Sequence, residues 1–147
     1  MTHAVGFDIF MTSAMSLATK SNFKEASKNF HMAGSYVVSV LDDVLPNWTW
    51  KENPSIHMTF DKFWRSKLDF VYAMKDLMTL NFAYSGQGIT DKNAIRLLKR
   101  VEGQCHRSLA NWMNEDNAAL MNWARASRAL LMARICTEND EWGKALG

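Results

Sequence analysis

Charged and apolar residues separate onto opposite sides of a helix in the segment from Thr90 to Trp112. At 100° per residue, the basic side chains fall within an arc of about 100°, and the apolar side chains fill the opposite arc. The basic stripe consists of Lys92, Arg96, Lys99, Arg100 and Arg107. The apolar side consists of Leu97, Leu98, Val101, Cys105, Leu109 and Trp112. This pattern predicts a surface helix and constrains the fold more than any other feature of the chain.

Apolar residues also recur at intervals of three and four in the first part of the chain, where they predict two helices. The first helix covers most of residues 1–18 and ends at a polar run over residues 19–22. The second extends from about Phe23 to Leu45. Pro46 is expected to stop it, because proline has no backbone N–H and disfavours a helical conformation in the residue before it.

Two more helices are predicted around the segment that carries the basic stripe. One begins near Thr59 or Asp61, either of which can cap it, and breaks at Gly86-Gln87-Gly88. Thr90 is then expected to cap the stripe helix. The last helix runs from about Ala118 to Ile135, and its large apolar residues cover roughly 200° of arc. We therefore expect it to be the most buried helix.

No segment alternates apolar and polar residues as a strand would, so the fold class is predicted to be all-α. With 147 residues, of which 48% are hydrophobic, the chain has the size of one domain with a substantial core. The simplest architecture is a single-domain antiparallel bundle of about five helices over residues 1–147. Residues 136–147 reverse the sign of the charge and are expected to form a short acidic C-terminal tail.

An alternative architecture of tetratricopeptide-like helix pairs is suggested by two triplets 68 residues apart, twice the 34-residue period of that family. The triplets are Ala26, Phe30 and Ala33, then Ala94, Leu98 and Val101. The first triplet resembles the second-helix signature of the family. The intermediate copy is missing, and the two prolines would fall inside the helix that should precede it. Ordinary alternation of small and large residues between packed helices explains the triplets equally well.

The formal net charge of +2 conceals an uneven distribution. Residues 1–90 carry eight basic and eight acidic side chains, whereas residues 91–134 carry eight basic and four acidic ones. This local excess permits nucleic-acid binding without requiring it. No window approaches the roughly 18 apolar residues of a membrane span, and the two cysteines sit in helical patterns, so we expect a cytoplasmic protein with no membrane partner. The four histidines are scattered, and no cofactor or metal is expected.

One catalytic hypothesis depends on Arg100 and His106, an arginine followed by five residues and a histidine. This spacing resembles the ribonuclease motif of the HEPN superfamily, an all-helical family. The resemblance implies a dimer in which paired Arg and His side chains cleave RNA through its own 2′-hydroxyl without metal. A histidine near neutral pKa can move the proton, and an arginine can hold the phosphate. Val101 departs from the polar residue common at that place in the family, and the resemblance covers only these seven positions.

The leading functional hypothesis is a small helical interaction protein, acting as an adaptor, an inhibitor or an assembly subunit. A strong predicted core without a catalytic cluster motivates it, and an enzyme is the less expected interpretation. Its surfaces would be helix faces and the long connection over residues 46–58, where Trp48 and Trp50 are expected either to pack against the bundle or to bind a partner. The partner would be another protein, and self-association fits the apolar composition.

Nucleic-acid binding through the basic stripe is the alternative from a second functional class. Guanidinium groups at helical spacing can meet phosphates in a bidentate manner, and three arginines of the last helix extend the set. These arginines are Arg125, Arg128 and Arg134. Aromatic residues, the usual companions of basic side chains in single-strand binding, are missing from this side.

Overall fold

The computed structural model describes residues 3–47, 53–83, 88–113 and 115–138. Within these ranges the chain is all-α and contains no strand, which confirms the predicted fold class. The helices are α1 (His3–Thr19), α2 (Phe23–Ser39), α3 (Pro54–Phe82), α4 (Asp91–Asn111) and α5 (Glu115–Glu138). A π-helical turn over Val40–Val44 and a 3-10 turn over Leu45–Asn47 follow α2.

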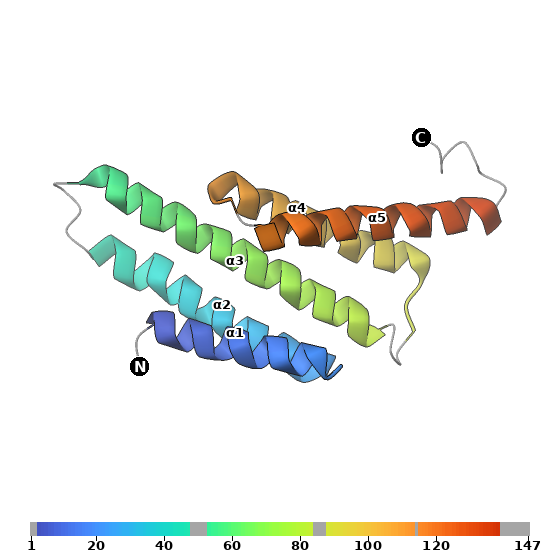
Figure 1. Cartoon of the computed structure of the whole chain (residues 1–147), viewed down its shortest axis with the longest axis horizontal. Helices are drawn as coiled ribbons and strands as arrows, with labels where there is room; N and C mark the ends of the chain where they lie inside the picture. Colours follow the sequence, from blue (N-terminus) through green and yellow to red (C-terminus); the bar gives the residue numbers. More distant parts are fainter. Residues whose placement is uncertain (1–2, 48–52, 84–87, 114, 139–147) are drawn as a thin grey trace.

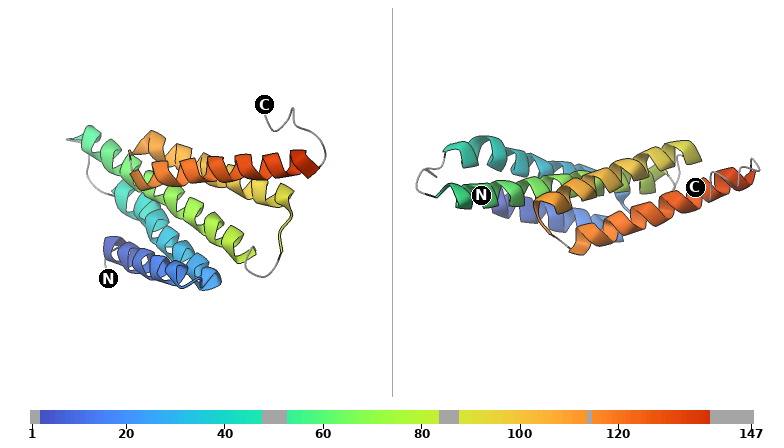
Figure 2. Two further views of the ribbon diagram at one scale, coloured as in Figure 1. Left: turned by 45° about the vertical axis from the view of Figure 1, so that its right-hand side comes forward. Right: turned by 90° about the horizontal axis from the view of Figure 1, so that it is seen from above.

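The five helices form an antiparallel bundle in which each helix packs chiefly against its neighbours in sequence (Figure 1). Helix α3 lies in the middle, with α1 and α2 on one side and α4 and α5 on the other (Figure 2). With 29 residues, α3 is the longest helix and contributes to the core on both sides. No helix within the described residues is long and apolar enough to span a membrane.

A first core cluster lies between α1, α2 and the near side of α3. It contains two buried phenylalanines, Phe7 and Phe30, and further aromatic rings pack against it. Gly6 lets α1 approach α2 closely, because the ring of Tyr36 lies 2.5 Å from the position that a Cβ atom would take. A larger residue at this position would push the two helices apart.

A second core cluster lies between the far side of α3, α4 and α5. Its buried side chains are Ala73, Leu80, Ala94, Ile95, Leu98, Val101, Cys105, Ala124 and Leu131. The two triplets that suggested a repeat are thus buried in different clusters, Ala26, Phe30 and Ala33 in the first and Ala94, Leu98 and Val101 in the second. Small residues in these positions let neighbouring helices approach, and that role accounts for both triplets.

The connection between α2 and α3 differs from the prediction. The second helix was predicted to extend to Leu45, but α2 ends at Ser39 and is followed by the π-helical turn. Pro46 lies inside the 3-10 turn that comes next, so it does not mark the end of the helical path. Helix α3 begins at Pro54, so the predicted start near Thr59 or Asp61 was wrong. A proline at the first helical position loses no hydrogen bond, since the N–H there has no partner within the helix.

The predicted binding loop over residues 46–58 is therefore shorter than expected, because residues 54–58 belong to α3. Thr59, proposed as a cap, instead donates its hydroxyl proton to the Ser55 carbonyl oxygen at 2.9 Å, inside the helix. Trp48 and Trp50, predicted as binding residues, lie outside the described residues.

The start of α4 agrees with the prediction. The Thr90 side-chain oxygen accepts a hydrogen bond from the backbone N–H of Asn93 at 3.2 Å, and Thr90 itself has an extended conformation. A threonine at the N-cap satisfies one of the N–H groups that have no partner within the helix. The local cap and the local apolar pattern agree, so this boundary could be read from the sequence.

Helix α5 was predicted to be the most buried helix, and this was wrong. Among its residues 115–137, only Asn117, Ala124, Leu131 and Cys136 are buried, while Leu130 is 73% exposed. The helix stands at one end of the bundle, so α3 and α4 cover only one of its sides. Helix α5 also includes residues 136–138 of the predicted acidic tail, and residues 139–147 lie outside the described ranges.

Candidate functional site

All five residues of the basic stripe are exposed on α4, but they fall into two groups. Arg100 and Arg107 reach α3, where Arg100 Nη2 lies 3.5 Å from Asp76 Oδ1 and Arg107 Nε lies 3.6 Å from Asp69 Oδ1. The other three, Lys92, Arg96 and Lys99, form no ion pair with any residue that the structure describes. Part of the predicted binding surface is therefore engaged within the molecule.

Desolvation has a larger effect on the pKa of Asp69 than its ion pair with Arg107 has. Burial raises the pKa of its carboxyl group above 3.8, although the charge of Arg107, together with a weaker contribution from Arg65, acts in the opposite direction. A buried carboxylate loses hydration, and one half-exposed guanidinium at 3.6 Å restores only part of that loss. The ion pair of Arg107 and Asp69 connects α4 to α3, but it only partly stabilises the charged form of Asp69.

The arginines of α5 that were predicted to extend the stripe are paired with acids of α4. Glu102 accepts hydrogen bonds from Arg125 Nε at 3.0 Å and from Arg128 Nη2 at 2.8 Å. Arg134 is bound to Asp91 at the first turn of α4. These ion pairs hold α5 against α4. The three arginines are therefore less available to a nucleic acid than the prediction from the sequence assumed.

Two surface hollows meet at Gly103 on the outer side of α4. The first has a volume of about 340 Å³ and is lined by Arg96, Lys99, Arg100, Gly103, Gln104 and Arg107. The second has a volume of about 410 Å³ and is lined by Lys99, Glu102, Gly103, His106, Arg125 and Arg128. The first hollow has four cations and no acid in its lining, so it is the more favourable of the two for an anion.

Arg100 and His106 do not share a hollow within one copy of the protein. Arg100 lines the first hollow and is paired with Asp76, whereas His106 lines the second. Residues six apart on a helix point about 120° away from each other. The two side chains suggested by the HEPN resemblance are thus exposed but separated.

Helix α5 exposes an apolar surface to solvent, although the sequence predicted this helix to be buried. This outer face of α5 contains no charged residue. Its residues are Ala119, Asn122, Trp123, Ala126, Ala129, Leu130, Ala133 and Thr137. Its two large side chains are both exposed, Trp123 at 44% and Leu130 at 73%. The wide apolar arc of this helix in the sequence is the signal for such a surface, since an apolar arc wider than one neighbour can cover leaves part of it exposed.

A groove of about 260 Å³ adjoins the outer face of α5. It is lined by Leu80, Asn81, Leu98, Trp123, Ser127, Leu130 and Leu131. Trp123 and Leu130 belong to both features, so the exposed apolar surface continues from α5 toward α3 and α4.

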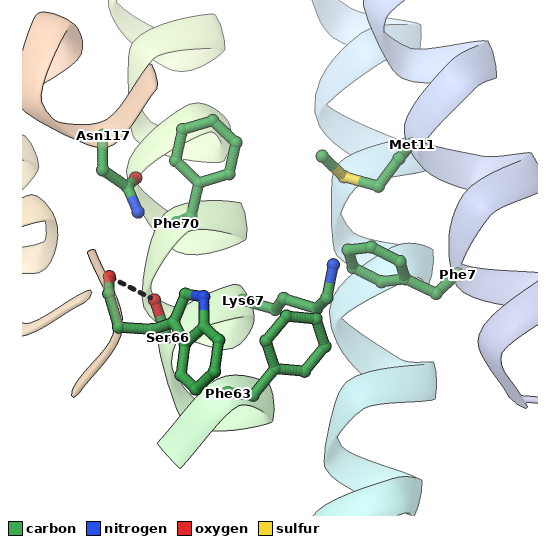
Figure 3. A pocket seen from close by; sticks show the side chains of 8 residues that line it. Phe7, Met11, Phe63, Ser66, Lys67, Phe70 and Asn117 are labelled. Carbon is green, nitrogen blue, oxygen red and sulfur yellow. Dashed lines mark hydrogen bonds between the residues drawn. The ribbon is translucent and has the colours of Figure 1, made fainter. Parts of the chain in front are cut away.

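A separate pocket of about 180 Å³ lies near the middle of α3 and was not predicted. Phe7 and Met11 of α1 face Phe63, Lys67 and Phe70 of α3 across it (Figure 3). Ser66, Trp112 and Asn117 complete the lining. Burial lowers the pKa of the Lys67 ammonium group below 10.5, and the nearby charge of Asp8 opposes this shift.

Buried hydrogen bonds form the base of this pocket. Ser66 Oγ donates to the Ser108 carbonyl oxygen at 2.9 Å, and Ser108 Oγ donates to the Ser66 carbonyl oxygen at 2.7 Å. Asn117 Nδ2 donates to Ser108 Oγ at 2.5 Å. Three helices therefore share one buried polar cluster, which holds the start of α5 against α3 and α4.

No group of three or more His, Cys, Asp or Glu residues that could hold a metal ion occurs in the described part of the chain. The two cysteines are buried free thiols, and burial raises the pKa of Cys105 to about 11. Comparison with protein-family models, with curated protein sequences and with solved structures finds no match to the chain. The functional conclusion therefore depends on the geometry of these surfaces.

Proposed function

We propose that the protein is an assembly subunit, a helical interaction protein whose outer face of α5 binds the same face of a second copy. The observation that supports this function is a solvent-exposed helix face without charge from Ala119 to Thr137. A helix at the surface of a monomer normally carries charged and polar residues on its outer side. A contiguous exposed apolar surface on a folded protein usually marks an interface.

The spacing on this face matches that of a helix pair. Residues at intervals of four and three form a seam along α5, as in coiled coils. The seam residues are Ala119, Trp123, Ala126, Leu130, Ala133 and Thr137. In such a seam, side chains of one helix fit between those of the other, so the sizes of facing residues decide which pairing is favourable.

The order of large and small residues makes the seam complementary to itself in an antiparallel pair. With a twofold axis beside residue 128, Leu130 faces Ala126 of the second copy, and Trp123 faces its Ala133. Each large side chain then meets a small one, and every contact occurs twice by symmetry. A parallel pair in the same register would instead place Trp123 on Trp123 and Ala126 on Ala126, which leaves both crowding and voids.

The expected association is weak. Helix α5 has 24 residues and is about 36 Å long. Because alanine occupies half of the seam positions, we expect one such helix pair to lie near or below the roughly 1,200 Å² lower limit of standard interfaces. The adjoining groove adds apolar area. We expect a dissociation constant in the micromolar range, about 8 kcal/mol of binding free energy.

Sedimentation velocity over a range of concentrations tests the proposal. The wild-type chain should pass from monomer to dimer, and Leu130→Lys should remain monomeric, because it places a charge in the seam. Leu130 is 73% exposed, so the monomer fold tolerates the change. Ile9→Lys, on the exposed side of α1 at 52% exposure, is the matched control and should dimerise like the wild type.

The pairing direction has its own test. Ala126→Leu should weaken an antiparallel dimer, because the new side chain meets Leu130 of the second copy, and the swap Ala126→Leu with Leu130→Ala should restore it. In a parallel dimer, Ala126→Leu would strengthen the pair. A wild-type chain that stays monomeric up to millimolar concentration would overturn the proposed function.

A second candidate function, nucleic-acid binding, is favoured by one observation. The hollow of about 340 Å³ on α4 is lined by four cations and no acid. Because Arg100 and Arg107 are paired with α3, we expect Arg96 and Lys99 to carry most of the phosphate contacts. Changing Arg96 and Lys99 to Ala should then flatten the salt dependence of RNA binding more than changing Arg100 and Arg107 does, whereas an unchanged slope would exclude this candidate.

A further inference from the structure

The ammonium group of Lys67 lies among aromatic rings, and no carboxylate of the described residues forms an ion pair with it. Its Nζ atom lies 4.6 Å from the ring centroid of Phe63, 4.9 Å from that of Phe7 and 5.8 Å from that of Trp64. Lys67 is half-buried and forms no hydrogen bond or ion pair with any residue that the structure describes. Asp8 is near enough to favour the charge, but it makes no ion pair with Lys67.

Ring faces compensate the lost hydration of a cation only in part. A cation over an aromatic face is attracted by the electrons of the ring, but the half-buried ammonium group has lost part of its hydration, and the charge of Asp8 offsets that loss only in part. A ligand that brings a negative charge to Nζ would remove this imbalance. The electrostatics of the site therefore favour an anion over a neutral molecule.

The pocket beside Lys67 has the size of a single ring with a small substituent. Its volume is about 180 Å³, and a cavity of about 150 Å³ is known to hold benzene. Most of the lining is apolar or aromatic, and Lys67 is its one cation. The hydroxyl of Ser66 lines the pocket as well, but it is engaged with Ser108. A single cation on a largely apolar wall suits a carboxylate, which carries one negative charge, better than a phosphate, which carries up to two.

We propose that this pocket binds a small aromatic monocarboxylate. The carboxylate accepts hydrogen bonds from Lys67 Nζ, and the ring lies between Phe7 of α1, Phe63 of α3 and Trp112 at the end of α4. Figure 3 shows the Lys67 side chain passing between Phe63 and Phe7 toward Met11, so that its amine is directed into the space between α1 and α3. None of the residues that line the pocket belongs to the outer face of α5, so its occupation does not require self-association.

Titration with benzoate tests this inference, with tryptophan fluorescence and calorimetry as the readouts. Trp112 lines the pocket and Trp64 lies beside Lys67, so occupation should change the emission. Benzoate should bind saturably at one site, and benzamide, which has nearly the same shape without the charge, should bind at least tenfold more weakly. Failure of benzoate to bind at millimolar concentration would overturn the proposal.

Variants of Lys67 separate charge recognition from general affinity for rings. Lys67→Met keeps the length of the side chain and should abolish the preference for benzoate over benzamide, while Lys67→Arg should retain it. Lys75→Met, on the same helix, is the control and should bind benzoate like the wild type. Its amine contacts His31 at 3.2 Å, away from the pocket. Equal preference in the wild type and in Lys67→Met would contradict the assignment of Lys67.

Discussion

On the side of α3 that faces α1 and α2, aromatic rings fill the core, whereas the described core on the side of α4 and α5 contains none. The second side has aliphatic and small residues instead, together with the buried cluster of Ser66, Ser108 and Asn117. Every ion pair between two different helices in the described residues also lies on that side. The two sides of one helix thus associate through different interactions.

This difference shows how apolar volume and polar contacts substitute for each other in a small bundle. A buried aromatic side chain removes 150–250 Å² from water, so rings stabilise the first side without directional contacts. The second side buries less apolar surface per residue, and hydrogen bonds and ion pairs fix how its helices lie against each other. We expect its stability to depend more on single polar groups and on pH.

The largest effect is expected from truncating the aromatic core. Phe30 is fully buried, and Phe30→Ala should cost about 3–5 kcal/mol of unfolding free energy, because it removes a ring and leaves a cavity. The matched change on the second side, Leu98→Ala, should cost less, about 2–4 kcal/mol. Urea denaturation measures both. If Leu98→Ala costs more than Phe30→Ala, the contrast between the two sides is wrong.

A smaller effect is expected from the buried polar cluster. Ser108→Ala should cost about 1–3 kcal/mol, because it removes the buried hydrogen bonds that the Ser108 hydroxyl makes with the Ser66 carbonyl oxygen and with Asn117 Nδ2. The double change Ser66→Ala and Ser108→Ala should cost less than the sum of the single changes. Ser35→Ala, on an exposed side of α2, is the control and should be nearly neutral. Strict additivity would show that the serines do not act together.

The smallest effect is expected at the pair of Arg107 and Asp69. Since the pKa of Asp69 is raised in the folded state, stability falls as pH rises from 3.8 through the folded-state pKa. Arg107→Met should raise this pKa further and cost about 0.2–1 kcal/mol at neutral pH. Well below pH 3.8 the difference should vanish, because Asp69 is then protonated in both states.

Urea denaturation of the wild type and of Arg107→Met, at neutral pH and well below pH 3.8, measures this difference in unfolding free energy. In a chain that already carries Asp69→Asn, the change Arg107→Met should have no such pH dependence. A pH-dependent loss that persists in that background would show that Arg107 acts on another group.

Local signals explain which parts of the fold could be predicted. Thr90 caps α4 through a contact only three residues away, and the apolar spacing of α4 repeats every turn. The start of α3 could not be read in this way. Proline both ends helices and begins them, and the pattern around Pro54 does not distinguish the two cases.

The candidate sites depended on contacts between distant segments. Arg100 and Arg107 were predicted as exposed cations, but their partners Asp76 and Asp69 lie in another helix. The rings of Phe63 and Trp64 lie within four positions of Lys67 on the same helix, but Phe7, which closes the site from α1, comes some sixty positions earlier in the chain. The spacing of residues along one helix carries no information on such pairs.

The amino-acid sequence alone established that the chain is helical, where α1 and α4 begin and end, and that α5 is apolar over an unusually wide arc. Only the tertiary structure decided which part of that arc is covered. Helical periodicity arises from the backbone and acts within a few residues, whereas burial depends on how many neighbours a helix has. Because α5 stands at the end of the bundle, one of its two apolar sides has no neighbour within the described chain.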